Sequence, residues 1–409
     1  MSKKILLVIC DGLGDRPVPE LGGLTPLQAA RKKNLDTIAP KAMQGLLYTI
    51  APGVVPGSDT SHLSLLGYDP KGIYTGRGPF EAAGVGINMK EGDVAFRCNF
   101  ATISRDRTVV DRRAGRVGEP DTGRLTSLLP AAKIDGTTVT FKESTEHRCV
   151  VVISGDGLGS SVTDTDPGAE GLKMLPAQGL DGSSAKTAAI LNEFTGMIID
   201  KFSDCAVNRD REARGLKPAN TILARGGGVY PRVEPFDKKH NMSFGAVAAE
   251  GLILGICRVL GGEAVTPPGA TANMKTDLMA KGRAAVDLLA KKDFVLIHVK
   301  PTDVAGHDGN ASGKVDIIER TDSMIGEIFS SFKGELVFAM TGDHSTPVTA
   351  KEHTCDPVPL LIYSKSLRHD GLDSFDENSA ARGSLASLRG LDLMTLLKGY
   401  ADRNEKYGA

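Results

Sequence analysis

The sequence predicts an α/β protein built on mainly parallel sheets. Short apolar runs, largely β-branched or aliphatic, each end in Gly, Pro, Asp or Asn, as buried strands do. Longer amphipathic stretches separate these runs, and such alternation is typical of parallel strands joined by helices. With 409 residues, 41% of them hydrophobic, the chain is too long for one ordinary core, so we expect two domains.

The expected elements follow from these patterns in chain order. Strands are predicted at residues 4–10, 149–154, 294–299, 335–340 and 359–363. Helices are predicted at residues 60–66, 183–202, 244–260, 276–291 and 314–332.

Two passages rich in turn residues mark domain crossings. Residues 67–79 are dense in Gly, Asp and Pro, and residues 264–271 contain a Pro-Pro-Gly triplet. We therefore expect a discontinuous first domain, formed by residues 1–75 and 265–409. Residues 76–264 would form an inserted second domain.

Composition excludes some classes of partner. The formal net charge is -1, whereas a general nucleic-acid binder is usually strongly basic. No apolar run reaches the roughly 20 residues of a membrane span, and the run at 5–10 is too short for a signal peptide. The six cysteines form no CxxC pair, which fits a reducing cytoplasm. We expect a cytoplasmic protein without nucleic-acid or membrane partners, and homo-oligomer formation stays open.

Three of the expected strands end in Asp or His. In open α/β sheets, ligands bind beyond the carboxyl ends of the strands, so three such ends point to one shared site. The residues are Asp11 after the first strand, Asp303 and His307 after the third, Asp343 and His344 after the fourth, and His353 just before the fifth.

Asp and His together suit a divalent transition metal, whereas carboxylates alone would better suit Mg²⁺ or Ca²⁺. Three Asp and three His exceed what one ion needs, so two ions are expected. Paired ions about 3.5–4 Å apart clamp the attacking and leaving oxygens of a phosphoryl group. We expect Mn²⁺ in preference, with Zn²⁺, Co²⁺ or Mg²⁺ as alternatives, and no organic cofactor.

Ser58 is the candidate nucleophile. It follows a Pro-Gly pair at the turn that opens the first expected helix, and a helix N-terminus favours negative charge. A metal ion on its oxygen is one way to activate a serine. Taken singly, Ser58 is an ordinary turn residue and each Asp an ordinary cap. Isolated histidines such as His298, His240 and His369 are interpreted as structural or surface residues.

In this order, these residues resemble the metal motif of the alkaline phosphatase superfamily. They are most similar to cofactor-independent (2,3-bisphosphoglycerate-independent) phosphoglycerate mutases of the shorter archaeal type. Supporting stretches outside the motif are Gly76-Arg77-Gly78-Pro79, Thr163-Asp164-Thr165-Asp166-Pro167 and Leu223-Ala224-Arg225-Gly226. The resemblance implies an alkaline-phosphatase-like, metal-binding parallel-sheet domain and an inserted α/β domain that binds the substrate.

The resemblance also implies an isomerase that interconverts 2- and 3-phosphoglycerate in glycolysis and gluconeogenesis. Ser58 would carry the phosphoryl group as a phosphoserine intermediate. One ion would be held by Asp303, His307 and His353, and the other by Asp11, Ser58, Asp343 and His344.

A substrate with a phosphate and a carboxylate needs cationic partners, and Arg suits bidentate contacts. Arg225, beside three glycines, is the preferred candidate, and Arg116 belongs to a loop that could equally be solvated. Lys300 could reach a phosphate oxygen or pair with a ligand carboxylate. Asp164 and Asp166 are candidate proton-shuttling groups, or an Asx-turn before a proline.

Two alternatives stay open. The same metal core could serve a phosphatase or another phosphomutase, and the fate of the phosphoserine distinguishes these from a mutase. A non-catalytic, metal-dependent binding protein is the alternative of another class. The intact Ser58 and the complete set of Asp and His residues argue against it.

Overall fold

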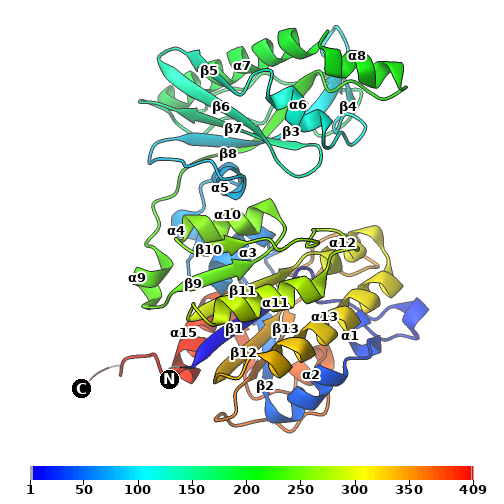
Figure 1. Cartoon of the computed structure of the whole chain (residues 1–409), viewed down its shortest axis with the longest axis vertical. Coiled ribbons are helices and arrows are strands. Elements are labelled where there is room, and N and C mark those ends of the chain that lie inside the picture. The colour runs from blue at the N-terminus through cyan, green and yellow to red at the C-terminus, as the bar shows by residue number, and fades with distance from the viewer. Residues whose placement is uncertain (1–2, 407, 409) are drawn as a thin grey trace. The chain divides into compact units, whose positions relative to one another are not determined.

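The computed structural model describes residues 3–406 and 408, which form two compact units (Figure 1). The first unit contains the described residues up to Gly72 and those from Glu234 onward, and the second is Ile73–Val233. The fold class predicted from the sequence, α/β with a discontinuous parallel-sheet domain, is confirmed.

The first unit is built on an eight-stranded sheet. Its strands from β10 to β12 are parallel, β13 is antiparallel to β12, β2 is antiparallel to β13, and β14 runs parallel to β2. In spatial order they are β10 (Glu263–Val265), β9 (Phe244–Val247), β11 (Phe294–Val299), β1 (Lys4–Cys10), β12 (Leu336–Thr341), β13 (Val358–Tyr363), β2 (Met43–Tyr48) and β14 (Ala386–Arg389).

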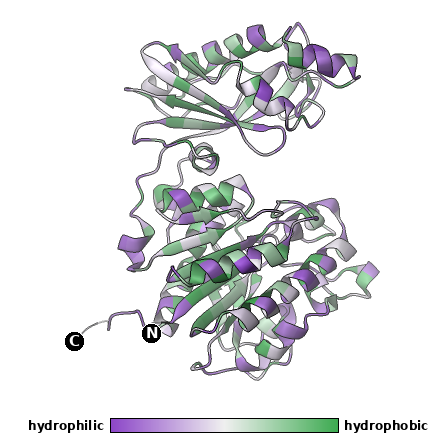
Figure 2. Cartoon of the chain, in the orientation of Figure 1, coloured by the Kyte–Doolittle hydropathy of each residue, from purple (hydrophilic) through white to green (hydrophobic). Residues whose placement is uncertain are grey.

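Strand β1 occupies the middle of this sheet, between β11 and β12. Its residues from Ile5 to Cys10 are fully buried, and Figure 2 shows the strands as predominantly hydrophobic. Because β1, β11 and β12 are parallel, their carboxyl ends meet at one edge of the sheet. The residues that follow these strands are therefore brought together.

Helices cover this sheet. Apolar residues of α1, α2, α11 and α13 form one core with every second residue of β1. The alternate residues of β1 are equally buried, so the other face is covered too. The helices are α1 (Pro26–Ala29), α2 (Lys33–Ile38), α3 (Ser58–Leu65), α4 (Pro70–Ile73), α9 (Phe236–His240), α10 (Gly251–Val259), α11 (Leu278–Leu289), α12 (Pro301–Asp308), α13 (Ala311–Ser331), α14 (Glu377–Ala380) and α15 (Gly390–Tyr400), with the 3₁₀ turns Pro19–Leu21 and Ala39–Lys41.

The second unit has a six-stranded sheet whose pairings are all antiparallel. Its strands are β3 (Val94–Ile103), β4 (Val109–Asp111), β5 (Ala131–Ile134), β6 (Thr137–Glu143), β7 (Arg148–Ser154) and β8 (Thr221–Val229). Its helices are α5 (Gly78–Gly84), α6 (Asp121–Thr126), α7 (Gly182–Phe202) and α8 (Ala206–Ala213). The expectation of mainly parallel sheets is wrong for this unit, because short turns join strands such as β6 and β7, and short turns allow only antiparallel pairing.

The second domain boundary expected from the sequence also differs from the structure. It was placed after residue 264, whereas the structure places it after residue 233. The reason is that β9 and β10 pair into the first sheet. The expected helix at 244–260 is accordingly wrong in its first part, where Phe244–Val247 is a strand and α10 begins at Gly251. A short apolar run does not distinguish a strand from a buried helix.

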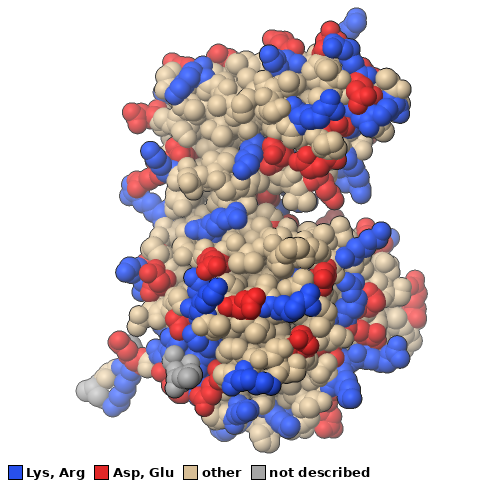
Figure 3. Space-filling view, in the orientation of Figure 1, with Lys and Arg blue, Asp and Glu red and all other residues tan. Residues whose placement is uncertain are grey.

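Among the described helices, none has the length and apolar character needed to cross a membrane. Basic and acidic side chains are interspersed over the face shown in Figure 3. The six cysteines are all free.

Candidate active site

The carboxyl edge of the first sheet brings seven predicted site residues together. Asp11 directly follows β1, Asp303 lies in the first turn of α12 after β11, and Asp343 and His344 follow β12. Ser58 is the first residue of α3, and its side chain is nearly buried. His307 and His353 complete the set, from α12 and from the loop before β13.

His344 lies at the centre of the first group. Its Nε2 lies 3.3 Å from Asp11 Oδ1 and 3.3 Å from Asp343 Oδ2. Ser58 Oγ lies 3.1 Å from the same nitrogen. Among the described residues, neither Asp11 Oδ1 nor Asp343 Oδ2 has a hydrogen-bond partner. Two buried carboxylate oxygens without a hydrogen-bond partner, beside a ring nitrogen and a hydroxyl, form a donor set that would suit a divalent cation.

Asp303 lies at the centre of the second group. His307 Nε2 lies 3.4 Å and His353 Nε2 lies 3.6 Å from Asp303 Oδ1. His307 Nδ1 lies 2.8 Å from the carbonyl oxygen of Lys351, and His353 Nδ1 lies 2.9 Å from that of Pro56. A carbonyl only accepts, so both Nδ1 atoms carry the hydrogen. Each Nε2, which faces Asp303, is therefore the nitrogen left available to a metal ion.

The two groups are linked through Thr346. Its hydroxyl donates to Asp303 Oδ1 at 2.8 Å and accepts from His344 Nδ1 at 3.0 Å. Asp303, His344 and His353 also offer ligand atoms that all lie within 4.8 Å of one another. The residues present thus fit two closely spaced cations.

Negative charge dominates the centre of the site. Burial alone would lower the pKa of His344, but the carboxylates of Asp343 and Asp11 outweigh burial and raise it to about 9. Without a metal ion, the imidazole is therefore held as a cation by the carboxylates. A divalent ion placed there would displace that proton, because only the neutral ring binds metal.

Lys300 lies between the two groups. Its Nζ donates to Asp303 Oδ2 at 2.7 Å and to Asp11 Oδ2 at 3.0 Å. It also lies 3.7 Å from Glu250 Oε2. Burial alone would lower the pKa of Lys300, but these carboxylates raise it well above its usual value. Of the two interpretations made from the sequence, the pairing with a ligand carboxylate is the one present here.

The predicted substrate residues of the second unit lie beside β8. Arg225 Nη1 lies 3.3 Å from Asp166 Oδ2, and Arg112 forms a bidentate pair with the same carboxylate at 2.9 and 2.8 Å. Asp164 Oδ1 accepts from the backbone amide of Gly226 at 2.9 Å. Arg116 does not join them. It is exposed and lines a separate hollow of about 290 Å³ beside α6 and α8.

Further arginines share the face of the sheet that carries Arg225. Arg97 lies directly opposite Arg225 across β3 and β8, and Arg148 of β7 lies opposite Asn99 of β3. Burial and the neighbouring Arg77 and Arg148 lower the pKa of Arg97 to about 10. Several guanidinium groups on one face favour the binding of an anion there.

Two stretches singled out in the sequence, the one around Gly76 and the one around Gly226, pack against each other. A Cβ at Gly76 would overlap the carbonyl oxygen of Gly227, and one at Gly78 would overlap that of Ala95. Only glycine allows this approach of α5 to β3 and β8. This contact places Arg77 beside Gly226, the residue that follows Arg225.

Known proteins match this chain over its whole length. The mutase of Saccharolobus islandicus named 2,3-bisphosphoglycerate-independent phosphoglycerate mutase is 48% identical, with 99% of each chain covered. The family model described by the same words matches residues 39–208. The chain belongs to the 2,3-bisphosphoglycerate-independent phosphoglycerate mutase family. It is therefore an isomerase, an intramolecular phosphotransferase.

Solved structures agree with this family assignment. A Pyrococcus horikoshii protein is 37% identical with a TM-score of 0.85, and 100% of each chain is covered. A cofactor-independent phosphoglycerate mutase of Thermoplasma acidophilum is 36% identical with a TM-score of 0.73, covering 98% of this chain and 100% of the other.

Sequence reasoning missed several side chains beside the candidate ligands, among them His298 and Thr346. His298, set aside as an isolated histidine, lies 2.9 Å from Asp11 through its Nε2. Thr346, two residues after His344, was assigned no role. The register of β1 against β11, which pairs Ile9 with His298, brings His298 beside Asp11. No spacing in the sequence encodes that register.

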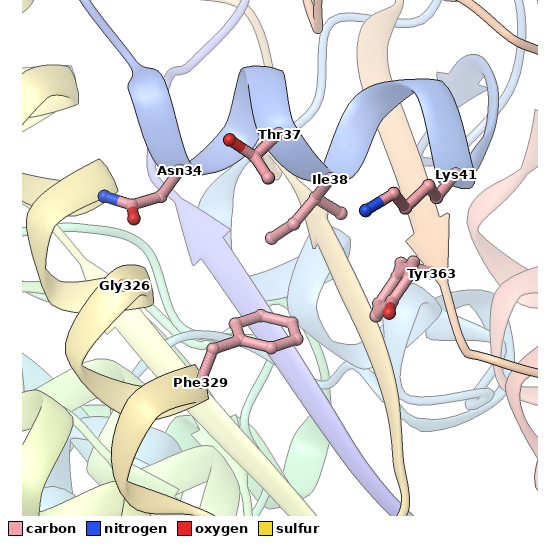
Figure 4. Close-up of a pocket in the computed structure, with 7 residues that line it drawn as sticks. All are labelled: Asn34, Thr37, Ile38, Lys41, Gly326, Phe329 and Tyr363. Carbon is pink, nitrogen blue, oxygen red and sulfur yellow. The ribbon is translucent and has the colours of Figure 1, made fainter.

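A hollow elsewhere on the first unit is not a second candidate for the mutase chemistry. It encloses about 240 Å³ between the α2 region and α13. Figure 4 shows its lining residues, which are Asn34, Thr37, Ile38, Lys41, Gly326, Phe329 and Tyr363. These residues include no carboxylate, imidazole or thiol that could hold a metal ion or attack phosphorus.

Proposed function

We propose that this enzyme interconverts 2-phosphoglycerate and 3-phosphoglycerate through a phosphoserine on Ser58, at a site that holds two divalent metal ions. The observation that carries the proposal is the convergence of Ser58 Oγ, His344 Nε2 and two unpaired carboxylate oxygens at distances of 3.1–3.3 Å. The proposed ligands of one ion are Asp303, His307 and His353, and those of the other are Asp11, Ser58, Asp343 and His344.

The mixed nitrogen and oxygen donors favour Mn²⁺, with Zn²⁺, Co²⁺ and Mg²⁺ as alternatives. When bound, such ions neutralise phosphoryl charge and lower the pKa of a serine hydroxyl. The position of Ser58 at the start of α3 adds the partial positive charge of a helix N-terminus.

In the first step, Ser58 Oγ attacks phosphorus and the bond to one glycerate oxygen breaks. Ser58 loses its hydroxyl proton, and the departing glycerate oxygen gains one. In the second step, the other glycerate hydroxyl attacks the phosphoserine and loses its proton, while the bond from phosphorus to Ser58 Oγ breaks and Ser58 Oγ regains a proton. The sum is a transfer within one molecule, provided that glycerate stays bound and water is excluded.

We propose that the second unit retains the glycerate. Arg225 is the main contact, because Asp166 holds its guanidinium on the sheet face that also carries Arg97 and Arg148. Asp164 shapes the backbone at Gly226. Lys300, which lies between the two ligand groups, is the proposed phosphate contact. Arg116 is the less favoured substrate contact of the second unit, because it lines a separate hollow.

The test is conversion of 3-phosphoglycerate in an enolase-coupled assay, with chelator-treated protein before and after Mn²⁺ is added. We expect activity only with the metal, and its loss in Ser58→Ala. Short incubation with ³²P-labelled substrate, followed by acid quenching and peptide mapping, should place the label on Ser58. Label that is absent from Ser58 while isomerisation proceeds would refute the intermediate.

A phosphatase is distinguished in the same reaction. Free phosphate should form far more slowly than 2-phosphoglycerate. Release of phosphate without isomerisation would refute the mutase proposal. The proposed activity places the enzyme in glycolysis and gluconeogenesis, and we propose the cytoplasm as its compartment.

A further inference from the structure

Two buried histidines outside the predicted ligand set contact residues of the candidate site. His62 belongs to α3, one turn after Ser58, and His298 belongs to β11. Both are fully buried, and their rings meet edge to face with centroids 5.2 Å apart at 69°. A buried imidazole without a polar role would be costly, so each ring needs an explanation.

His298 holds one carboxylate of the site. Its Nε2 lies 2.9 Å from Asp11 Oδ2, and an ionised carboxylate only accepts, so this nitrogen carries the hydrogen. The bond turns Asp11 so that Oδ1, the unpaired oxygen, faces His344. His298, together with Lys300, which donates to the same oxygen at 3.0 Å, therefore fixes which oxygen of Asp11 is offered to a cation.

His62 holds the peptide of the nucleophile. Its Nδ1 lies 2.7 Å from the carbonyl oxygen of Ser58, to which it must donate. The same nitrogen lies 3.6 Å from Asp343 Oδ2, the other unpaired carboxylate oxygen. His62 therefore lies against both the Ser58 peptide and the Asp343 carboxylate.

Neither ring is placed as a ligand. Asp11, Glu250 and His298 offer atoms within 4.8 Å of one another, but the Lys300 ammonium lies 3.0 Å from Asp11 and 3.7 Å from Glu250. The positive charge of Lys300 therefore disfavours the binding of a further cation by these three residues. In the part of the chain that the structure describes, the second nitrogen of each ring, His62 Nε2 and His298 Nδ1, has no hydrogen-bond partner.

We propose that His62 and His298 are positioning residues, each acting through one ring nitrogen: His298 orients Asp11 for a divalent ion, and His62 orients Ser58 beside Asp343. This rests on the two-metal function proposed above. Partners of metal ligands fix ligand orientation, and their loss commonly costs 10–100-fold in metal affinity or activity.

Because only one nitrogen of each ring is used, amide side chains provide a matched test. The amide nitrogen of Asn takes the place of Nδ1, and that of Gln reaches the place of Nε2. His298→Gln and His62→Asn can keep the bond, whereas His298→Asn and His62→Gln cannot. The four variants differ in which nitrogen is replaced, while all four lose the ring.

The readout is Mn²⁺ binding to chelator-treated full-length protein by titration calorimetry, alongside kcat and KM for 3-phosphoglycerate and thermal unfolding of the metal-free form. We expect His298→Asn to bind Mn²⁺ about 10–100-fold more weakly. We expect His62→Gln to lower kcat with little change in KM. His298→Gln and His62→Asn should stay within a few-fold of the wild type.

The control is His240, a buried histidine of the same unit that also bonds to a backbone carbonyl, through Nε2 to Leu66 at 2.9 Å. His240→Asn, which loses that bond, should leave Mn²⁺ affinity unchanged. The proposal would be overturned if all four variants lost Mn²⁺ affinity and activity equally, or if His298→Asn and His62→Gln behaved like the wild type. An ion bound directly to His298 in a Mn²⁺-soaked crystal would overturn it as well. Wild-type protein that binds Mn²⁺ but does not isomerise would refute the proposed function alone, since the binding comparison still decides the role of His298.

Discussion

The Thr346 hydroxyl fixes His344 Nδ1 as a hydrogen-bond donor. The Thr346 hydroxyl donates to Asp303 Oδ1 at 2.8 Å, so it can only accept from His344 Nδ1, 3.0 Å away. His344 Nε2 is consequently the nitrogen that faces Asp11, Asp343 and Ser58. One hydroxyl thereby sets the donor orientation in both halves of the proposed two-metal site.

Thr346→Val should test this link, because valine keeps the shape of threonine and removes the hydroxyl. We expect Mn²⁺ affinity and kcat to fall by about 10–100-fold, as for other partners of metal ligands. Thr346→Ser should recover most of both. Titration calorimetry and the coupled assay provide the measurements, and equal behaviour of the valine and serine variants would contradict the proposed link.

His353→Ala should weaken the binding of one ion and leave the other in place. The ring lies 3.6 Å from Asp303 and is partly exposed, so its removal creates no buried cavity. We expect metal analysis after gel filtration to give close to one ion per chain and turnover to drop severely, with metal-free thermal unfolding unchanged. His369→Ala, at an exposed position, is the matched control. Unchanged metal content and rate in His353→Ala would exclude it as a ligand.

Lys314 and Asp15 form a fully buried ion pair at 2.7 Å that ties α13 to the loop after β1. Lys314 also donates to the carbonyl oxygens of Gly14 and Thr346. Lys314→Met should destabilise the first unit by about 3–5 kcal/mol, because it leaves Asp15 buried without its partner. Urea unfolding followed by circular dichroism provides the measurement.

Two variants make the Lys314 result specific. Adding Asp15→Asn to Lys314→Met should restore part of the stability, since it removes the uncompensated charge. Arg209→Met, which breaks an exposed pair with Asp204, should cost less than about 1 kcal/mol. A double variant less stable than Lys314→Met would show that the charge is not the cause.

Glu377 should make stability fall as pH rises. Its carboxyl bonds to the Thr25 hydroxyl and the Asp15 amide, and burial raises its pKa from 4.5 to about 7. The folded state therefore favours the protonated form. Its contribution is complete below the unfolded pKa and is lost as pH rises through 7.

Glu377→Gln should flatten that dependence, because glutamine stays neutral. Between pH 5 and 8 the wild type should lose up to about 3 kcal/mol that the variant does not. Urea midpoints at the two pH values provide the measurement, with the exposed Glu20→Gln as control. Parallel pH profiles for the wild type and Glu377→Gln would mean that Glu377 is ionised in the folded protein throughout.

The sequence by itself determined the fold class and the set of candidate ligands. Both are encoded locally: a buried strand is a short apolar run, and the Asp or His that follows it stands at the strand end whatever the rest of the chain does. Since parallel strands share one edge, three such ends sufficed to predict that Asp11, Asp303 and Asp343 lie together. Ser58 could be added because a helix start also has a local pattern.

Only the tertiary structure decided which atoms meet. The pairing of Arg97 with Arg225 and the approach of His298 to Asp11 depend on strand register, which joins residues more than 100 positions apart in the chain. Strand pairing likewise placed Phe244–Val247 in the first sheet, and the short turns between strands such as β6 and β7 made the second sheet antiparallel. A short apolar run has the same composition in a helix or a strand. Its conformation is therefore determined by the strands with which it pairs rather than by its own sequence.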